Sequence, residues 1–179
     1  MRFRDIKIES DRLLLVPIEL SYAEDVFINM NTDVTKYMYP KPADDISETI
    51  SWITGSIKRM EAGSNVQLVI LLKDTGEFIG CAGLHSVDCK TPEFGIWTKK
   101  SSHGNEYGRE AMTALYDWAC ENIDFDYILY PVDKRNTASR KIPESLGGVI
   151  AKEYKEKNAS GFELQEVEYH IYPHGRRSK

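Results

Sequence analysis

A turn between a predicted strand and a predicted helix carries the residues best suited to bind an anion. The chain runs from a strand-forming segment at 93–98 through a polar loop with Gly104 and Gly108 into a long amphipathic helix. The first N–H groups of a helix have no partner inside it, and the helix dipole adds partial positive charge there. A phosphate or pyrophosphate can therefore bind between Gly104 and Arg109 without a lysine. An ordinary turn is the alternative, because the spacing is neither that of a dinucleotide-binding loop nor that of a P-loop.

A second polar segment, Asn136–Arg140, follows a buried strand and begins another helix. Asn136 occupies the cap position and Ser139 lies three residues further, so both side chains are expected near the carboxyl end of that strand. Crevices at this end of the strands are where open α/β sheets bind ligands. A helix cap beside a solvated serine is the simpler interpretation of the same residues.

The apolar patterns along the chain predict a mixed α/β domain that positions these two segments. Runs rich in β-branched and apolar residues predict strands at 12–17, 66–72, 77–84, 93–98, 125–132, 149–154 and 162–172. Helical spacing predicts helices at 21–30 and 45–62, from just after Gly104 to near Asn122, and from Asn136 to about Leu146. The strand, helix and strand between residues 93 and 132 indicate a parallel strand pair joined by a crossover.

The last predicted strand shows a regular alternation of side chains. Apolar and polar residues alternate from Glu166 to Ile171, which predicts one buried face and one solvated face, with Glu166 and Glu168 on the solvated one. Two further expectations are local. Ser21 caps the first helix, and the tail at 175–179 is mobile.

The composition is that of one globular domain over residues 1–179, with an ordered core at about 7–172. A net charge of −5 argues against a nucleic-acid partner and favours a cationic one such as an amine. Cys81, Cys89 and Cys120 have neither the count nor the spacing of a disulfide or zinc framework. Because no segment has the apolar run of a signal peptide or a membrane span, we expect a cytoplasmic protein without a membrane partner.

Four segments, in order along the chain, match motifs of one acyltransferase superfamily. Glu9–Leu15 is similar to the opening strand ETERLLL, Leu72–His85 to the hairpin KDTGELIGxxGLH, Glu93–Trp97 to EIGYW, and Asn136–Gly147 to NxxSxxxxEKLGF at its Asn, Ser, Leu and Gly. His103–Gly108 stands in the place of the pyrophosphate loop Q/R-x-x-G-x-G/A. Over nearly its whole length, the chain therefore resembles the GNAT superfamily of acyl-CoA-dependent N-acetyltransferases, in its RimJ/RimL-like branch.

This resemblance implies a fold and a cosubstrate. The fold is α/β, with a central mixed, mostly antiparallel twisted sheet that is splayed at a parallel strand pair and has helices on both faces. Acetyl-CoA would lie in the splay, and no metal is implied. The cofactor-binding residues that the resemblance implies are Ile96, Trp97, Thr98, His103, Gly104, Asn105, Glu106, Tyr107, Gly108, Arg109, Asn136, Ser139 and Arg140.

The implied reaction moves the acetyl group of acetyl-CoA to a primary amine by direct attack, which requires a base for the ammonium proton and a donor for the departing thiolate. Ser139 resembles the family serine proposed to meet that thiolate, and Asn136 would bind the cofactor arm or the new amide. Glu93 is our candidate base, because partial burial beside a parallel crevice would raise its pKa. A plain surface carboxylate is the alternative for Glu93, and His85 is a second candidate base.

Several positions depart from the family pattern. Glu106 replaces a glycine beside the expected pyrophosphate, and His103 replaces Gln or Arg. Pro143 falls inside the second helix, where it removes a hydrogen bond and is expected to kink the chain. Gly148 replaces a phenylalanine. These changes keep open a second class of function, a catalytically weak or inactive GNAT-fold module that binds acyl-CoA as a sensor.

The acceptor is not fixed by these motifs. A protein N-terminus and a small amine both fit the acidic charge, and a monomer and a homodimer are both left open. Selection among acceptors is expected to lie in the first helix, the loop at 37–42 and the hairpin at 157–161, since such segments differ most between proteins that share a fold.

Overall fold

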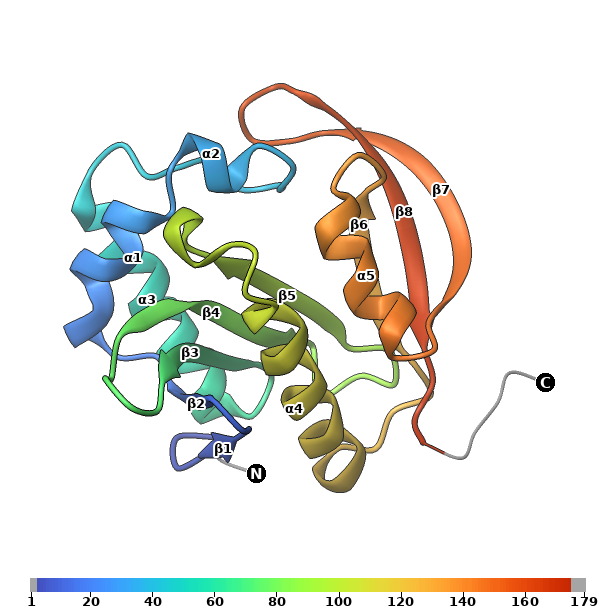
Figure 1. The fold of residues 1–179 in the computed structure, drawn as a ribbon, viewed down its shortest axis with the longest axis horizontal. Helices are drawn as coiled ribbons and strands as arrows, with labels where there is room; N and C mark the ends of the chain where they lie inside the picture. Colours follow the sequence, from blue (N-terminus) through green and yellow to red (C-terminus); the bar gives the residue numbers. More distant parts are fainter. Residues whose placement is uncertain (1–2, 175–179) are drawn as a thin grey trace.

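One twisted sheet of eight strands, in the order β1-β2-β3-β4-β5-β6-β8-β7, forms the centre of the computed structural model, which describes residues 3–174 (Figure 1). The strands are β1 (Ile8–Glu9), β2 (Leu13–Pro17), β3 (Val66–Leu72), β4 (Phe78–His85), β5 (Glu93–Thr98), β6 (Ile128–Asp133), β7 (Val149–Lys157) and β8 (Glu163–Ile171). The predicted strands are confirmed with small shifts at their ends, and β1 is additional. The tail at 175–179, which we expected to be mobile, lies outside the described residues.

Helices connect these strands. They are the short 3-10 helices η1 (Leu20–Tyr22) and η2 (Lys100–Ser102), and the α-helices α1 (Ala23–Asn29), α2 (Thr32–Thr35), α3 (Ile46–Ala62), α4 (Tyr107–Asn122) and α5 (Thr137–Ser145). Ser21 does not cap the first helix as predicted, because η1 precedes it and α1 begins at Ala23 without a side-chain cap. The next cap is Asn31, whose side chain accepts hydrogen bonds from the first turn of α2.

The parallel pair predicted from the strand-helix-strand pattern is β5 and β6, and the other strand pairs are antiparallel. The two parallel strands are in register at a single position, where Glu93 faces Leu129. The Leu129 N–H donates to the Pro92 carbonyl over 2.8 Å at the same place. Beyond this point the strands diverge (Figure 1). The predicted fold, a mostly antiparallel sheet splayed at a parallel pair, is confirmed.

Helices cover both faces of the sheet. On one face, Gly108 in the first turn of α4 lies over the side chains of Ile96 and Thr98 in β5. Because successive side chains of a strand point to opposite faces, Trp97 belongs to the other face. There its ring lies 5.8 Å from that of Phe78, on the side that α1 and α3 cover. The site residues at the end of β5 therefore stand between two packed layers.

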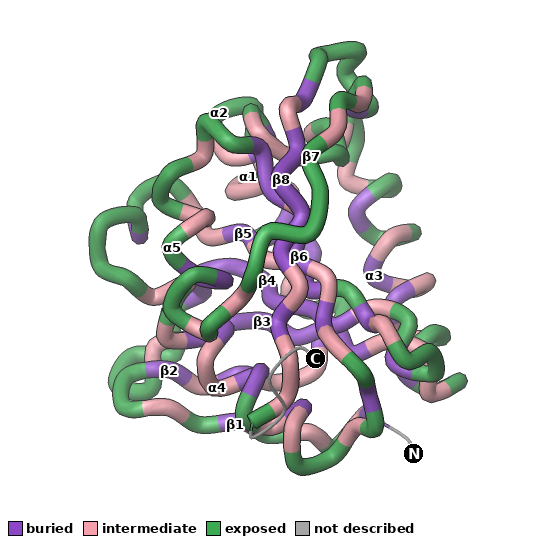
Figure 2. The backbone as a smooth tube through the Cα atoms, turned by 90° about the vertical axis from the view of Figure 1, so that its right-hand side faces the viewer, coloured by how far each residue is buried: buried purple, intermediate pink, exposed green. Residues whose placement is uncertain are grey.

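The solvated face predicted for β8 is wrong for its two glutamates. The apolar residues of the strand are buried as predicted, but Glu166 is only 6% exposed and Glu168 only 7% exposed. β8 is an inner strand, and Figure 2 shows the exposed β7 running beside the buried β8. Glu168 is neutralised by Lys152 of β7 at 3.1 Å, whereas Glu166 faces a cavity. Alternation thus identifies which residues share a face, but not what covers that face.

Two positions that depart from the family pattern, Pro143 and Gly148, lie in and just after α5, and the kink expected at Pro143 stays a prediction. The helix continues through Pro143 and ends two residues later at Ser145. The N–H of Gly148 then donates to the Pro143 carbonyl over 2.8 Å. A Cβ on Gly148 would lie 2.8 Å from that same carbonyl oxygen, so the phenylalanine found at this place in the family motif does not fit this backbone.

Candidate active site

A cavity of about 820 Å³ opens where β5 and β6 diverge. Its walls are the starts of α4 and α5, the segment after α2, and the β7–β8 hairpin. The predicted site residues that line it are Glu93, Ile96, Trp97, Thr98, His103, Gly104, Glu106, Tyr107, Gly108, Arg109, Asn136 and Ser139. Asn105 and Arg140 do not belong to this lining. Arg140 donates through Nε to the hydroxyl of Tyr169 over 3.0 Å, so its predicted contact with the cofactor stays a prediction.

The edge of β5 that faces the cavity has free backbone groups. Lys99 donates to the Ile79 carbonyl over 2.8 Å, and hydrogen-bonded pairs alternate along an antiparallel ladder. From the register of β4 and β5, the backbone groups of Trp97 therefore point toward β4. Those of Ile96 and Thr98 point into the gap beside β6, where the Thr98 carbonyl already lies within hydrogen-bond distance of His103 Nε2, at 3.0 Å. An extended amide-containing ligand can pair with this edge.

The start of α4 is open to an anion. Glu106, the residue before the helix, has a left-handed backbone with φ 61° and ψ 16°. Within residues 3–174 no side chain caps this helix, so its first N–H groups are available. The Glu106 carboxylate forms an ion pair with Arg109 one turn later. The family glycine at this position is explained by the left-handed backbone, which costs a residue with a side chain about 1–2 kcal/mol.

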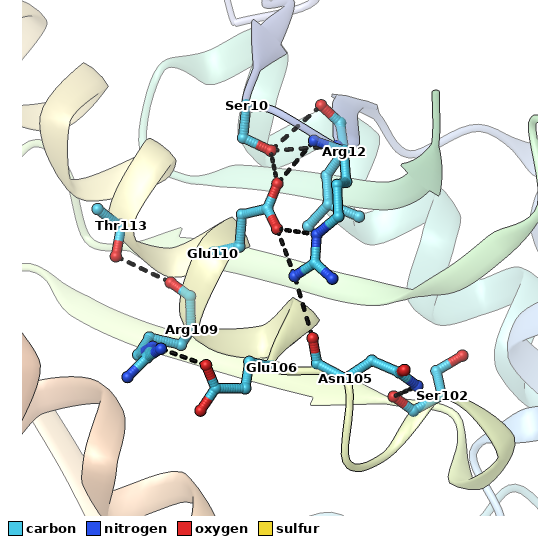
Figure 3. A network of polar contacts seen from close by, with 9 residues as sticks. Ser10, Arg12, Ser102, Asn105, Glu106, Arg109, Glu110 and Thr113 are labelled. Atoms are coloured by element: carbon cyan, nitrogen blue, oxygen red, sulfur yellow. Dashed lines mark hydrogen bonds and ion pairs between the residues drawn. The ribbon is translucent and has the colours of Figure 1, made fainter. Parts of the chain in front are cut away.

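A polar clamp holds the first turn of α4 against the start of β2 (Figure 3). The Glu110 carboxylate accepts hydrogen bonds from the Ser10 hydroxyl at 2.6 Å, the Arg12 N–H at 2.8 Å and the Arg12 guanidinium at 2.7 Å. Burial by itself would raise the pKa of Glu110, but these donors hold it below its usual value. Arg12 also donates to the Asn105 carbonyl over 3.0 Å. Our sequence analysis missed Glu110, although its partner Arg12 lies in the opening motif.

Asn136 and Ser139 are held together at the start of α5. The Asn136 Oδ1 caps the helix by accepting from the Ser139 N–H over 3.2 Å, which confirms the predicted cap. The Ser139 hydroxyl lies 2.9 Å from that of Tyr130, and Tyr130 is 3% exposed. Burial raises the pKa of Tyr130, so its phenol is neutral and fixes the serine hydroxyl. The sequence analysis missed Tyr130, which the alternation of β6 directs toward α5.

The two candidate bases differ in their surroundings. Glu93 faces the cavity. Glu93 is an exposed residue by its accessible surface. The protein atoms near its carboxylate still desolvate it, and this desolvation followed by the charges of Glu168 and Glu156 raises the pKa of Glu93. Within residues 3–174 no side chain forms a hydrogen bond or ion pair with it. Its carboxylate is therefore free to accept a proton from a ligand.

His85 lies outside the cavity lining. The Asn65 Oδ1 accepts from the Ser86 N–H, so the Asn65 amide nitrogen faces His85 Nδ1, 3.0 Å away. That contact leaves the imidazole proton on Nε2, which lies beside Gly95. Burial, then the charge of Arg59, lowers the pKa of His85. A neutral ring that lies outside the cavity lining, with Nδ1 already engaged by Asn65, is not placed to act as a base for this cavity.

Two of the three segments expected to select the acceptor meet above the cavity. The Asn158 side chain of the β7–β8 hairpin donates to the Met38 carbonyl over 3.1 Å. Its neighbour Ala159 donates to the Tyr39 carbonyl over 2.9 Å. Tyr37 and Pro40 contribute to the lining from the same segment, whereas no residue of α1 does. Figure 1 shows the hairpin tip beside the chain that follows α2.

Glu156 of β7 and Glu166 of β8 also line this end of the cavity. The sequence analysis placed Glu166 on a solvated face and did not single out Glu156.

Among the described residues, no group of three or more His, Cys, Asp or Glu side chains is arranged to hold a metal ion. In the same part of the chain, no helix has both the length and the apolar character that a membrane span needs.

Comparisons with solved structures agree with this geometry. A RimL ribosomal L7/L12 alpha-N-protein acetyltransferase in complex with coenzyme A superposes with a TM-score of 0.83 at 16% identity, over 93% of this chain and 98% of that one. A spermidine N-acetyltransferase from Vibrio cholerae, in complex with CoA and spermine, gives a TM-score of 0.79 at 17% identity, over 92% and 97%. At these identities the likeness establishes the fold.

Comparisons of sequence establish the family. The chain is 30% identical over 141 residues to the uncharacterised N-acetyltransferase p20 of Bacillus licheniformis, covering 76% of this chain and 79% of that protein. It is 28% identical over 156 residues to the uncharacterised protein YkkB of Bacillus subtilis strain 168, covering 85% and 90%. A family model described as an acetyltransferase (GNAT) domain matches residues 12–149. The protein belongs to the GNAT acetyltransferase family.

Proposed function

We propose that this protein transfers the acetyl group of acetyl-CoA to a primary amine by direct attack in a ternary complex. The observation that carries the proposal is the cavity at the divergence of β5 and β6. It combines a free strand edge, an uncapped helix start and side chains suited to proton transfer. Family membership supports the same reaction class.

Acetyl-CoA is the cosubstrate in this proposal, and the cavity fits its parts. The backbone groups of Ile96 and the N–H of Thr98 would pair with the amides of the pantetheine arm, while the Thr98 carbonyl contacts His103. The start of α4 and the Arg109 side chain would hold the pyrophosphate. The amide nitrogen of Asn136 would donate to the cofactor arm or to the new amide, since its Oδ1 is already used by the helix cap.

Two side chains would move protons in the reaction. A primary ammonium must lose a proton before its nitrogen can attack a thioester carbonyl. Glu93 would accept this proton, and its raised pKa makes it a better base than an ordinary carboxylate. The C–N bond forms and the C–S bond breaks, while the Ser139 hydroxyl, held by Tyr130, stabilises the departing thiolate by a hydrogen bond. The second proton that the nitrogen loses ends on this sulfur, so the products are the amide and the CoA thiol.

The structural neighbours indicate a broad class of acceptor, namely compounds with a primary amine. One structural neighbour is a spermidine N-acetyltransferase and another acts on the N-terminus of ribosomal protein L7/L12. Both substrates present a primary amine. We therefore place the acceptor of this protein among small amines and protein N-termini.

The first test is calorimetric titration of the full chain with acetyl-CoA, CoA and desulfo-CoA, followed by thiol release with a panel of primary amines. We expect micromolar binding, and release of one thiol for each amine acetylated. Ser139→Ala should lower kcat about 10–100-fold with little change in cofactor affinity. Ser145→Ala, in the same helix but outside the cavity, is the matched control. An absence of binding up to millimolar acetyl-CoA overturns the proposal.

The second candidate function, an acyl-CoA sensor, has one observation in its favour. Glu106 places a carboxylate at the helix start and already neutralises Arg109, which is unfavourable for a pyrophosphate. Tight binding of acetyl-CoA without thiol release toward any amine in the panel would support the sensor and contradict the enzyme.

A further inference from the structure

Resting on the proposed function, we propose that the acceptor is a diamine or polyamine, whose reacting amine lies at Glu93 and whose second ammonium group binds between Glu156 and Glu166. The inference concerns the end of the cavity beneath the β7–β8 hairpin. It narrows the acceptor from primary amines in general to amines with a second positive charge.

The first observation is the state of Glu166. Its side chain is only 6% exposed, and it lines the cavity. Within residues 3–174 nothing donates a hydrogen bond to its carboxylate and no cation pairs with it. Buried polar groups are almost always hydrogen-bonded, and buried charges are almost always paired. Among the described residues no sealed side-chain oxygen lacks a partner, so the Glu166 oxygens reach the solvent of the cavity, where a cation from outside the chain can pair with them.

The neighbouring carboxylates show that this chain does pair its other buried acids. Asp133, fully buried, accepts from the Arg135 guanidinium at 2.6 and 2.8 Å and from the Gln165 N–H at 2.8 Å. Glu168 pairs with Lys152 at 3.1 Å and with His170 at 3.0 Å. Glu166 differs from both. Arg135, a cation close to it, is already engaged by Asp133.

The second observation is that two other acidic side chains line the cavity together with Glu166. Glu156 lies on the adjacent strand, two residues beyond Tyr154, which is the register partner of Glu166. Residues two apart on a strand share a face. Glu93 of β5 is the third of these acidic side chains that line the cavity. Within residues 3–174, neither Glu156 nor Glu93 has a hydrogen-bond or ion-pair partner for its side chain. This wall therefore presents three carboxylates without an ion-pair partner to a cavity whose lining also holds Lys141 and the Glu106-paired Arg109.

The rest of this end of the cavity suits an alkyl chain. Tyr37, Met38 and Pro40 contribute apolar surface from the segment after α2, and the ring of Tyr154 contributes more from β7. Methylene groups between two ammonium groups would contact these side chains while the charges reach the carboxylates. A monoamine of the same length would bury the same methylenes but leave Glu166 unpaired.

The protonation of Glu166 gives an independent readout. Burial, followed by the charges of Glu156, Asp133 and Glu93, raises its pKa to about 7, and Arg135 opposes the shift in part. Tyr154, also beside it, is held neutral by a pKa of about 12. A bound ammonium would lower the pKa of Glu166 and release a proton near pH 7. Calorimetry in buffers of different ionisation enthalpy measures that release.

The decisive experiment compares 1,4-diaminobutane with butylamine as acceptors, using the full chain, saturating acetyl-CoA and thiol release. We expect a KM at least about 10-fold lower for the diamine, which corresponds to one charge-assisted contact. Glu156→Gln and Glu166→Gln should each raise the KM for the diamine more than that for butylamine. Glu153→Gln, an equal charge change on the opposite face of β7, is the matched control and should leave both values unchanged.

The outcomes separate this inference from the proposed function. Equal KM values for the two amines, or acetylation of an N-terminal peptide in strong preference to the diamine, overturn the inference and leave the acetyltransferase intact. If no amine is acetylated, the proposed function fails instead. The inference is then decided by calorimetry with 1,4-diaminobutane alone, where binding with proton release that Glu166→Gln abolishes supports it and absence of binding overturns it.

Discussion

At the scale of single residues, Glu106 is the position where the chain departs most from what the site requires. Its backbone is left-handed, a conformation that glycine adopts without steric cost. Its carboxylate would also stand beside the bound pyrophosphate. The structure shows how the chain accommodates it, since the side chain turns to Arg109 and away from the Glu110 clamp (Figure 3).

We expect Glu106→Gly to tighten acetyl-CoA binding about 5–10-fold, because it removes a negative charge and frees Arg109 for the phosphates; this is worth about 1 kcal/mol. Glu106→Gln removes the charge but keeps the left-handed strain, so it separates the two causes. Calorimetric titration at low ionic strength measures both variants. Unchanged affinity in both would mean that the carboxylate does not act on the cofactor.

We expect the protonation state of Glu93 to set the pH dependence of the reaction. A base must be unprotonated, so kcat/KM for butylamine, which has no second ammonium group for Glu166 to bind, should rise with pH through the raised pKa of Glu93. Glu93→Gln should lower kcat about 10²–10⁴-fold and remove this acidic limb. Glu163→Gln, an exposed glutamate outside the cavity that pairs with Lys155, is the control. Retention of the acidic limb in Glu93→Gln would assign the base to another group.

At the scale of elements, the clamp between β2 and α4 positions the anion site without contacting it. Glu110 links Ser10 and Arg12 to the helix, and Arg12 also holds the Asn105 carbonyl in the preceding loop. We expect Glu110→Ala to lower the free energy of unfolding by about 1–3 kcal/mol and to weaken acetyl-CoA binding several-fold. Glu121→Ala, on an exposed position of the same helix, is the control. Urea unfolding and cofactor titration measure the two effects, and a loss of stability without a loss of affinity would make the clamp purely structural.

Prediction of elements from the sequence succeeded where apolar periodicity and turn residues agreed. β5 was predicted with its observed bounds. Helix α3 begins one residue after its cap Asp45 and ends at Ala62, just before the left-handed Gly63. Ser21 failed as a cap because a polar residue near a helix start does not reveal whether a 3-10 turn precedes it. Caps depend on local backbone geometry, which the residue type alone does not fix.

Prediction of the site succeeded for segments that are contiguous in the chain and failed for groups assembled across strands. The loop before α4 and the start of α5 were found because each is one motif. Glu156 and Glu166 meet only through the register of β7 and β8. Tyr130 reaches Ser139 only through the packing of α5 on β6. Alternation placed Glu166 and Glu168 on one face of β8, but the solvation predicted for that face is wrong, because its burial depends on β7 and on the segment after α2.

At the scale of the whole molecule, the unpaired Glu166 should affect stability as well as specificity. Its pKa is about 7 in the folded protein and about 4.3 in an unfolded chain. Between these values the folded state binds more protons, so the free energy of unfolding falls as pH rises from about 4 to about 7. The unpaired Glu166 carboxylate thus lowers the free energy of unfolding of the ligand-free protein at and above neutral pH.

We therefore expect Glu166→Gln to raise the free energy of unfolding at pH 8 by about 1–3 kcal/mol and to change it little at pH 4. Urea unfolding at both pH values measures the difference, with Glu153→Gln as the control. Adding 1,4-diaminobutane at pH 8 should stabilise the wild-type protein more than Glu166→Gln, because the variant lacks one of the carboxylates that the diamine neutralises. If wild type and variant change in parallel with pH and with diamine, Glu166 is not the unpaired charge that the cavity presents, and both the stability argument and the acceptor assignment lose their basis.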